Sequence, residues 1–291
     1  TNKGLMVLKE HGVNVDKRMQ QLEVAERQIP FLLATNDVMV DLEPYGWVLT
    51  DSREIKEKLN VNRSDNIHGT LRNEYRGSRE YGIYTYLHGV SDKHIAKMLR
   101  EIKNYSQVKD KAITLQDFII FKKGKRGFEQ LITAIMNEEQ GGLLARVSSI
   151  KLFPFTFGKY YLRVFDDERE LLKFACETSE LPLEFKRYLK QTEVSAKYSG
   201  LNCIVEHDGK EKYFVNLVDN DLKKVFNIQQ YRKEDYETDG RKVLVYVIGG
   251  MREEIYEGLF RNYHHVEYME ADEQMTNYLA NIEPIEKRRG L

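Results

Sequence analysis

The sequence is poor in cysteine and proline and has no long hydrophobic run. Its two cysteines, Cys176 and Cys203, are too few for the disulfide framework of a secreted domain and lack the spacing of a zinc site, so we expect buried free thiols. Five prolines argue against a modular protein rich in linkers. No stretch reaches the roughly 18 apolar residues of a membrane span, and no charged and then apolar leader precedes Thr1. We therefore expect a cytoplasmic chain with no membrane partner.

Common catalytic motifs and an excess of one charge are missing too. The sequence contains no GxxxxGK[ST] phosphate loop, no GxGxxG after a strand-like segment, and no HExxH or GxSxG. His264 and His265 are adjacent in a strand-like segment, so they face opposite ways and cannot share a metal ion. The 45 basic and 46 acidic side chains give a net charge of -1. Any affinity for nucleic acid must therefore come from a local patch.

What the 291 residues do contain is an alternation of helical and strand-like periodicity. The predicted helices are 15–43 with a break at Pro30, a turn within 51–59, 92–105, 127–138, 168–176, 219–231, 251–260 and 270–281. The predicted strands are 46–50, 66–72, 80–87, 117–121, 149–157, 160–165, 202–206, 212–218, 242–248 and 264–269. This order predicts an α/β fold in which helices flank a mixed sheet.

The order of hairpin, helix, strand and helix occurs twice, at residues 66–138 and 202–261. This repetition predicts two similar halves. The residue identities barely match between the two segments, so a coincidence of two common supersecondary units is the alternative.

The strongest local charge feature lies between residues 92 and 126, where ten basic side chains accompany four acidic ones. Its helical part presents basic residues every three or four positions, and the loop KKGKR follows the apolar strand. Such a surface can contact phosphates, although a solvated helix face is the alternative. Together with two arginines of the hairpin, the residues expected to contact DNA are Lys93, Lys97, Arg100, Lys122, Lys123, Lys125, Arg126, Arg72 and Arg76.

Candidates for catalysis are weaker. Tyr84 and Tyr86 share one face of a predicted strand, and a tyrosine hydroxyl can open a phosphodiester when a metal or cations hold the phosphate. Strands also favour tyrosine for packing alone. His68, before Gly69 at the entry to a strand, is the third candidate.

Three stretches of the first 165 residues share a further pattern: TNKGLMVLKEHG at 1–12, RQIPFLLATNDVMVDL at 27–42, and the strand pair NIHGTLR and REYGIYTYL followed by a helix and DFIIF. Together they resemble the replication-relaxation family of plasmid and integrative-element proteins, which includes relaxases of the MobC type. The first stretch resembles the end of that family's winged-helix domain, the second its linking helix before Trp47, and the third its restriction-endonuclease-like core.

The resemblance implies three parts. Residues 1–60 would be a helical segment continuing from a winged-helix domain, 61–165 a restriction-endonuclease-like α/β core, and 166–291 a second α/β unit. Nuclease-like members place an Asp where His68 stands and acidic residues where Ile83, Tyr84 and Thr85 stand. Because these carboxylates would hold the divalent ion, we expect no intact nuclease centre.

From these observations we expect a DNA-binding protein of a plasmid or other mobile element, acting in replication, relaxation or conjugative transfer. Its partners would be DNA and other replication or transfer proteins, and oligomers are compatible with the sequence. One alternative is a relaxase or nickase that uses a tyrosine or Mg²⁺, and we expect no other cofactor. A second alternative is a protein-interaction scaffold with an acidic C-terminal surface made of Glu253, Glu254, Glu257, Glu267, Glu270, Asp272 and Glu273.

Overall fold

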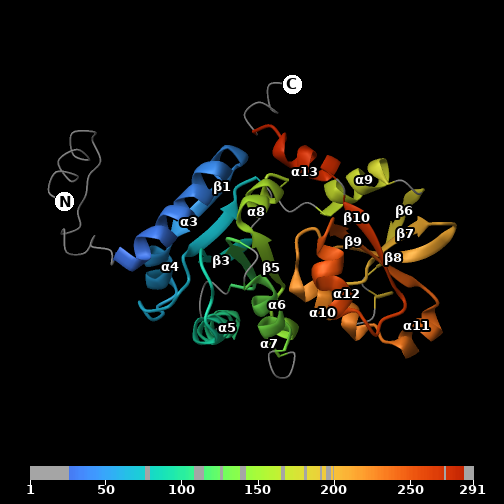
Figure 1. Cartoon of the computed structure of the whole chain (residues 1–291), viewed down its shortest axis with the longest axis horizontal. Helices are drawn as coiled ribbons and strands as arrows, with labels where there is room; N and C mark the ends of the chain where they lie inside the picture. Colours follow the sequence, from blue (N-terminus) through green and yellow to red (C-terminus); the bar gives the residue numbers. More distant parts are fainter. Residues whose placement is uncertain are drawn as a thin grey trace.

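The computed structural model describes residues 26–75, 79–107, 115–124, 127–137, 142–164, 168–179, 182–190, 192–194, 198, 200–271 and 273–284. In these ranges the chain forms two five-stranded sheets with helices on both faces (Figure 1). The expected α/β fold, with mixed sheets flanked by helices, is confirmed. None of the helices in these ranges combines the length and the apolar composition that crossing a bilayer requires.

The first sheet carries its strands in chain order and is antiparallel in one half and parallel in the other. β1, β2 and β3 are antiparallel neighbours, whereas β3, β4 and β5 run parallel. The strands are β1 (Trp47–Asp51), β2 (Gly69–Asn73), β3 (Glu80–Tyr86), β4 (Asp117–Lys122) and β5 (Ser149–Pro154). Every residue of β4 is buried, as expected for a central parallel strand covered on both faces.

Helices cover both faces of the first sheet (Figure 1). α3 and α8 pack on one face, and α5, α6 and α7 on the other. The helices are α3 (Ile29–Leu42), α4 (Ser52–Lys58), α5 (Asp92–Gln107), α6 (Phe128–Met136), α7 (Gly142–Arg146) and α8 (Phe155–Leu162). Short 3-10 turns at Glu26–Gln28 and Glu43–Tyr45 flank α3.

The second sheet has the same strand order and the same pattern of directions. β6, β7 and β8 are antiparallel neighbours, and β8, β9 and β10 run parallel. The strands are β6 (Leu183–Tyr188), β7 (Cys203–His207), β8 (Lys210–Asn216), β9 (Lys242–Ile248) and β10 (Val266–Ala271). The helices around it are α9 (Glu168–Thr178), α10 (Leu222–Gln230), α11 (Lys233–Asp239), the π-helical turn η4 (Arg252–Tyr256), α12 (Glu257–Leu259) and α13 (Glu273–Ala280).

One predicted strand differs from the structure, and three observed elements, α7, α11 and β6, were not predicted. The strand expected at 160–165 is wrong, because α8 occupies Phe155–Leu162 and buries Gly158, Lys159, Tyr161 and Leu162 against the sheet. That spacing is helical, so packing overrides the strand preference of the aromatic residues. β6 was not predicted, since five of its six residues are exposed and three are charged. The boundary expected at residue 61 falls between β1 and β2, inside the first sheet.

A buried polar junction joins the two sheets. Lys151 of β5 forms an isolated antiparallel bridge with Asp221, which precedes α10. The Lys151 ammonium lies 2.9 Å from a carboxylate oxygen of Asp219, and the Ile150 amide donates to Asp221 over 3.1 Å. Lys224 donates to the same Asp219 oxygen over 2.8 Å. α6 and α7 pack against α10 beside this junction, so the two units share one interior.

The charges of the junction are strongly perturbed by burial. Burial raises the pKa of Asp219, but the ammonium groups of Lys151 and Lys224 outweigh burial and leave that pKa below its usual range. Burial and then the neighbouring Asp219 carboxylate raise the pKa of Asp221 to about 7. Asp221 also accepts the amide of Lys223 over 2.9 Å and so caps α10.

We predict that Asp221→Asn removes a pH-dependent component of stability. The pKa of about 7 in the folded protein lies above the value of about 3.9 for an unfolded chain. Between these values the folded chain keeps a proton on Asp221 that the unfolded chain has released, so the contribution of Asp221 to the unfolding free energy falls as pH rises from about 4 to about 7. The asparagine keeps an acceptor oxygen for the amides of Ile150 and Lys223 and does not titrate.

Urea unfolding of both proteins at a series of pH values measures the difference. An unfolding free energy of the variant that rises relative to the wild type between about pH 4 and pH 7 supports the prediction. Parallel curves for the two proteins contradict it.

Candidate nucleic-acid interface

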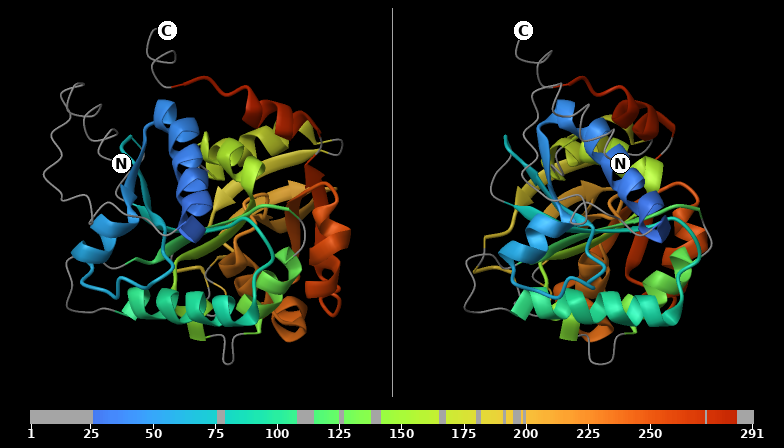
Figure 2. Two further views of the ribbon diagram at one scale, coloured as in Figure 1. Left: turned by 60° about the vertical axis from the view of Figure 1, so that its left-hand side comes forward. Right: turned by 90° about the vertical axis from the view of Figure 1, so that its left-hand side faces the viewer.

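Helix α5 lies at the outer surface, beneath the parallel part of the first sheet (Figure 2). Ser91 stands directly before it, and the Ser91 hydroxyl accepts the amide of His94 over 3.4 Å. The helix buries one apolar stripe against the sheet, formed by Ile95, Met98, Leu99, Ile102 and Tyr105. Because these residues recur every three or four positions, the intervening residues form a solvent-facing side.

The solvent-facing side of α5 is basic. Lys93 and Arg100 are exposed and Lys103 is half-buried. After Asp92, the only carboxylate of the helix is Glu101, and its residue is 4% exposed. Glu101 faces inward, so no carboxylate offsets the cations on the outer side of residues 93–107.

Two neighbours hold Glu101 in the interior. The backbone amide of Asn66 donates to both carboxylate oxygens over 2.9 Å, and the hydroxyl of Tyr84 donates over 3.2 Å. Burial raises the pKa of Glu101, and the hydrogen bond from Asn66 opposes this rise. This inward carboxylate therefore fixes the loop before β2 and keeps a negative charge off the α5 surface.

Lys97 lies partly at the surface and partly against Glu101 and the loop before β2. Its ammonium donates to the carbonyl of Ser64 and lies 3.8 Å from Glu101. We find Lys97 on the basic face as expected, but half-buried and tied to the loop at residues 61–66. The same loop contains the exposed Arg63, whose carbonyl accepts from the Lys56 ammonium of α4 over 3.3 Å. Sequence reasoning missed Arg63, since it lies in an aperiodic loop.

The KKGKR segment is only partly at the surface. Lys122 is 2% exposed and its ammonium donates to the Lys123 carbonyl. Burial lowers the pKa of Lys122, so it does not act as a surface cation, contrary to expectation. Lys123 is exposed and follows β4 at the sheet edge from which the chain enters α5. The expected contacts Lys125, Arg126 and Arg76 lie outside the described residues.

Arg72 lies at the other end of the sheet. It pairs in register with Glu80 at the start of β3, whereas Lys122 pairs with Tyr86 at the end of the same strand. Six residues of extended strand separate these two positions by about 20 Å. Arg72 is exposed, and this distance separates it from Lys122 and the KKGKR segment. Its guanidinium lies 3.9 Å from Glu74.

The three catalytic candidates are buried or packed. Tyr84 is 0% exposed, and burial, followed by the Glu101 charge, raises its pKa well above the usual value. The hydroxyl of Tyr86 is buried and has no hydrogen-bond partner among the described residues. His68 stacks on Phe31 with ring centroids 5.7 Å apart and accepts the amide of Thr85 at Nδ1. Burial lowers the pKa of His68 to about 4, so its imidazole is neutral.

No protein-family model, no curated protein and no solved structure matches the chain. Within the described ranges, no group of three or more His, Cys, Asp and Glu side chains is placed to hold a metal ion.

We predict opposite stability effects for two neighbouring tyrosines. Tyr84→Phe removes a buried donor to Glu101 and should lower the unfolding free energy by about 1 kcal/mol. Tyr86→Phe removes a buried hydroxyl without a partner in the described structure, so it should leave stability unchanged or raise it by about 1 kcal/mol. Urea unfolding at neutral pH measures both. Equal losses for the two variants would show that the two hydroxyls have equivalent surroundings.

Proposed function

We propose that this chain binds DNA and places the exposed face of α5 against the phosphate backbone. The observation that carries the proposal is the inward turn of Glu101, because it leaves Lys93, Arg100 and Lys103 on a helix whose residues 93–107 present no carboxylate to solvent. Neutralising phosphates with such cations releases counterions and provides affinity independent of sequence.

The dimensions of the face support this proposal. Lys93 and Arg100 are seven positions apart, which is about 10 Å along a helix axis. About three successive phosphates of one strand span the same axial distance. Arg63 precedes Ser64, whose carbonyl accepts from Lys97 of α5, so this exposed arginine adds a cation near the helix. Lys97 contributes less, because its ammonium already serves the Ser64 carbonyl.

The resemblance to replication-relaxation proteins supports a role at a mobile element, in replication, relaxation or transfer. The order α3, three antiparallel strands, α5 and the parallel strand β4 supports a restriction-endonuclease-like core in the first unit. The matching strand order and directions of the two sheets support two similar halves. We retain each of these assignments as part of the proposal.

A non-catalytic role fits the structure better than a tyrosine nucleophile. The Tyr84 hydroxyl is sealed against Glu101, and the Tyr86 hydroxyl is buried. A phosphodiester cannot reach either oxygen without opening the space between α5 and β3.

The acidic scaffold is also less favoured, because several of its carboxylates are paired with bases. Glu267 lies 2.6 Å from both Lys212 and Lys242. Arg252 lies 2.9 Å from Glu257 and 3.4 Å from Glu270. Among the described residues, these pairs reduce the acidic surface available to a protein partner.

We predict that Lys93→Gln with Arg100→Gln weakens DNA binding and flattens its salt dependence. Each lost phosphate contact should reduce the slope of log K against log salt by about 0.9 for duplex DNA, so the double variant should lose about two units of slope. Fluorescence anisotropy with a short labelled DNA at several salt concentrations measures both quantities.

The matched control replaces two lysines on other helices. Lys173→Gln with Lys233→Gln removes side chains that are 77% exposed on α9 and α11. This control should keep the wild-type slope. If both double variants change the slope equally, or neither changes it, the α5 face is not the DNA-binding surface.

A further inference from the structure

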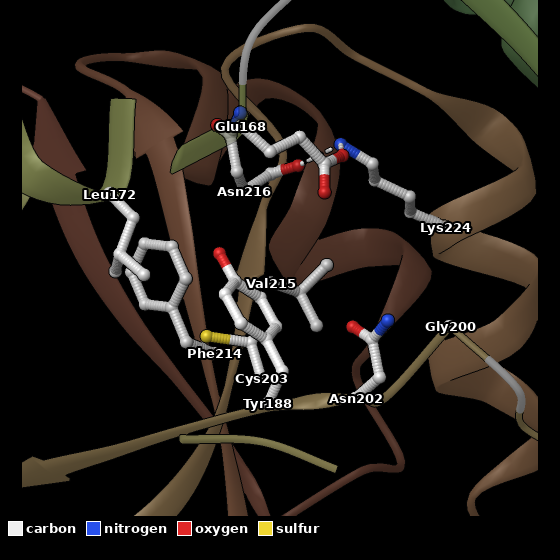
Figure 3. A pocket seen from close by; sticks show the side chains of 10 residues that line it. All are labelled: Glu168, Leu172, Tyr188, Gly200, Asn202, Cys203, Phe214, Val215, Asn216 and Lys224. Atoms are coloured by element: carbon white, nitrogen blue, oxygen red, sulfur yellow. Dashed lines mark hydrogen bonds and ion pairs between the residues drawn. The ribbon is translucent and has the colours of Figure 1, made fainter. Parts of the chain in front are cut away.

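A small open pocket lies in the second unit, beside the start of β7 and the end of the neighbouring strand β8. α9 and α10 border it, and the side chains of three adjacent strands line it (Figure 3). Leu172, Cys203 and Phe214 form an apolar floor, each no more than 6% exposed. Asn202 and Asn216 place two amides at its wall.

An irregularity of β6 places an aromatic surface at the mouth of this pocket. The pairing of β6 with β7 shifts between Phe185 and Arg187, so an extra residue interrupts the alternation of side chains. Phe185 and Tyr188 consequently share one face, with ring centroids 5.0 Å apart. They are 41% and 38% exposed, and the guanidinium of Arg169 lies 5.7 Å from the Tyr188 ring centroid. Exposed aromatic rings with nearby arginine form platforms on which nucleobases stack.

One buried amide group of the pocket lacks a hydrogen-bond partner among the described residues. Asn216 is 4% exposed, and its Oδ1 accepts the amide of Val218 over 3.0 Å. The Nδ2 group of the same side chain is buried and has no hydrogen-bond partner among the described residues. A buried donor without an acceptor costs free energy. Because this nitrogen is buried, a ligand acceptor would reach it only when the amide turns into the pocket, and the new hydrogen bond would then remove that cost.

Lys224, at the pocket wall, already has carboxylate partners. Lys224 donates to the Asn216 carbonyl over 2.9 Å and to Asp219 over 2.8 Å, and it also pairs with Glu168. Its positive charge is therefore balanced by two carboxylates. The recognition groups left in the pocket are the amides and the rings, which suit a neutral planar ligand with hydrogen-bonding edges.

We propose that this pocket receives the edge of an unpaired nucleobase, with the base plane against Tyr188 and a carbonyl or ring nitrogen accepting from Asn216 Nδ2. This inference rests on the proposed DNA binding and names what the second unit would recognise. Asparagine amides match the donor and acceptor edges of bases. The α5 face would contact the phosphates, and the pocket would select strands whose bases are exposed.

The test compares a short single-stranded oligonucleotide with an abasic strand of the same length, and adds free deoxynucleosides as probes without phosphate. The wild type should bind the base-containing strand about tenfold more tightly than the abasic strand, as expected for one stacked base. Tyr188→Ala and Asn216→Asp should each bring this ratio close to one. Tyr188→Phe should retain it, since the ring remains.

Two controls separate the pocket from the rest of the protein. Tyr75→Ala removes an exposed tyrosine of the first unit and should keep the wild-type ratio. The double variant Lys93→Gln with Arg100→Gln should weaken both strands by the same factor and leave the ratio unchanged. Thermal unfolding of each variant confirms that it is folded.

The outcomes distinguish this inference from the proposed function. Equal affinity of the wild type for both strands, or a ratio unaffected by Tyr188→Ala and Asn216→Asp, overturns the base pocket while DNA binding stands. If neither strand binds, but saturation-transfer NMR shows nucleosides contacting the wild type and not Asn216→Asp, the pocket stands and the proposed function fails. If neither the strands nor the nucleosides bind, both are overturned.

Discussion

The two sheets depend on a buried junction of opposite charges. Lys151 comes from the first sheet, Asp219 and Asp221 come from the loop after β8, and Lys224 comes from α10. Isolated, any of these charges would be expensive to bury, and removal of one partner leaves the others uncompensated. The junction therefore fixes where α10 lies against β5, and with it the wall of the pocket that contains Asn216 and Lys224. The same few residues therefore contribute to stability and shape the candidate base site.

A second inward-facing carboxylate shapes the other candidate surface. Glu101 could neutralise the basic stripe if it pointed to solvent, but Asn66 and Tyr84 hold it inside. The same arrangement buries the hydroxyl that sequence reasoning offered as a nucleophile. One polar cluster thus supports a basic exterior and argues against a tyrosine-based reaction. The first unit would then contact phosphates through α5, and the second unit would contact bases near Tyr188.

Periodicity predicted the elements whose burial follows a regular repeat. Helix α5 and strand β4 were expected close to their observed bounds, because each has a strong apolar pattern. The helix α8 was mistaken for a strand, since its aromatic residues favour strands until packing on the sheet decides. The cations of α5 were predicted from their helical spacing, whereas the KKGKR residues and the hairpin arginines were predicted from local counts, which carry no register. Sequence counts therefore could not show that Arg72 and Lys122 lie at opposite ends of β3, nor that Lys122 is buried. The pocket had no sequence signal, since a bulge and an unmatched amide arise only from pairing.

Lysine footprinting tests the central claim most directly. Acetylation of the free protein and of the protein saturated with DNA, followed by mass spectrometry, reports which ammonium groups become covered. The account predicts that Lys93 and Lys103 on α5 lose reactivity when DNA is bound, while Lys173 and Lys233 on α9 and α11 keep theirs. Unchanged reactivity of Lys93 and Lys103 in a DNA-bound sample would contradict it.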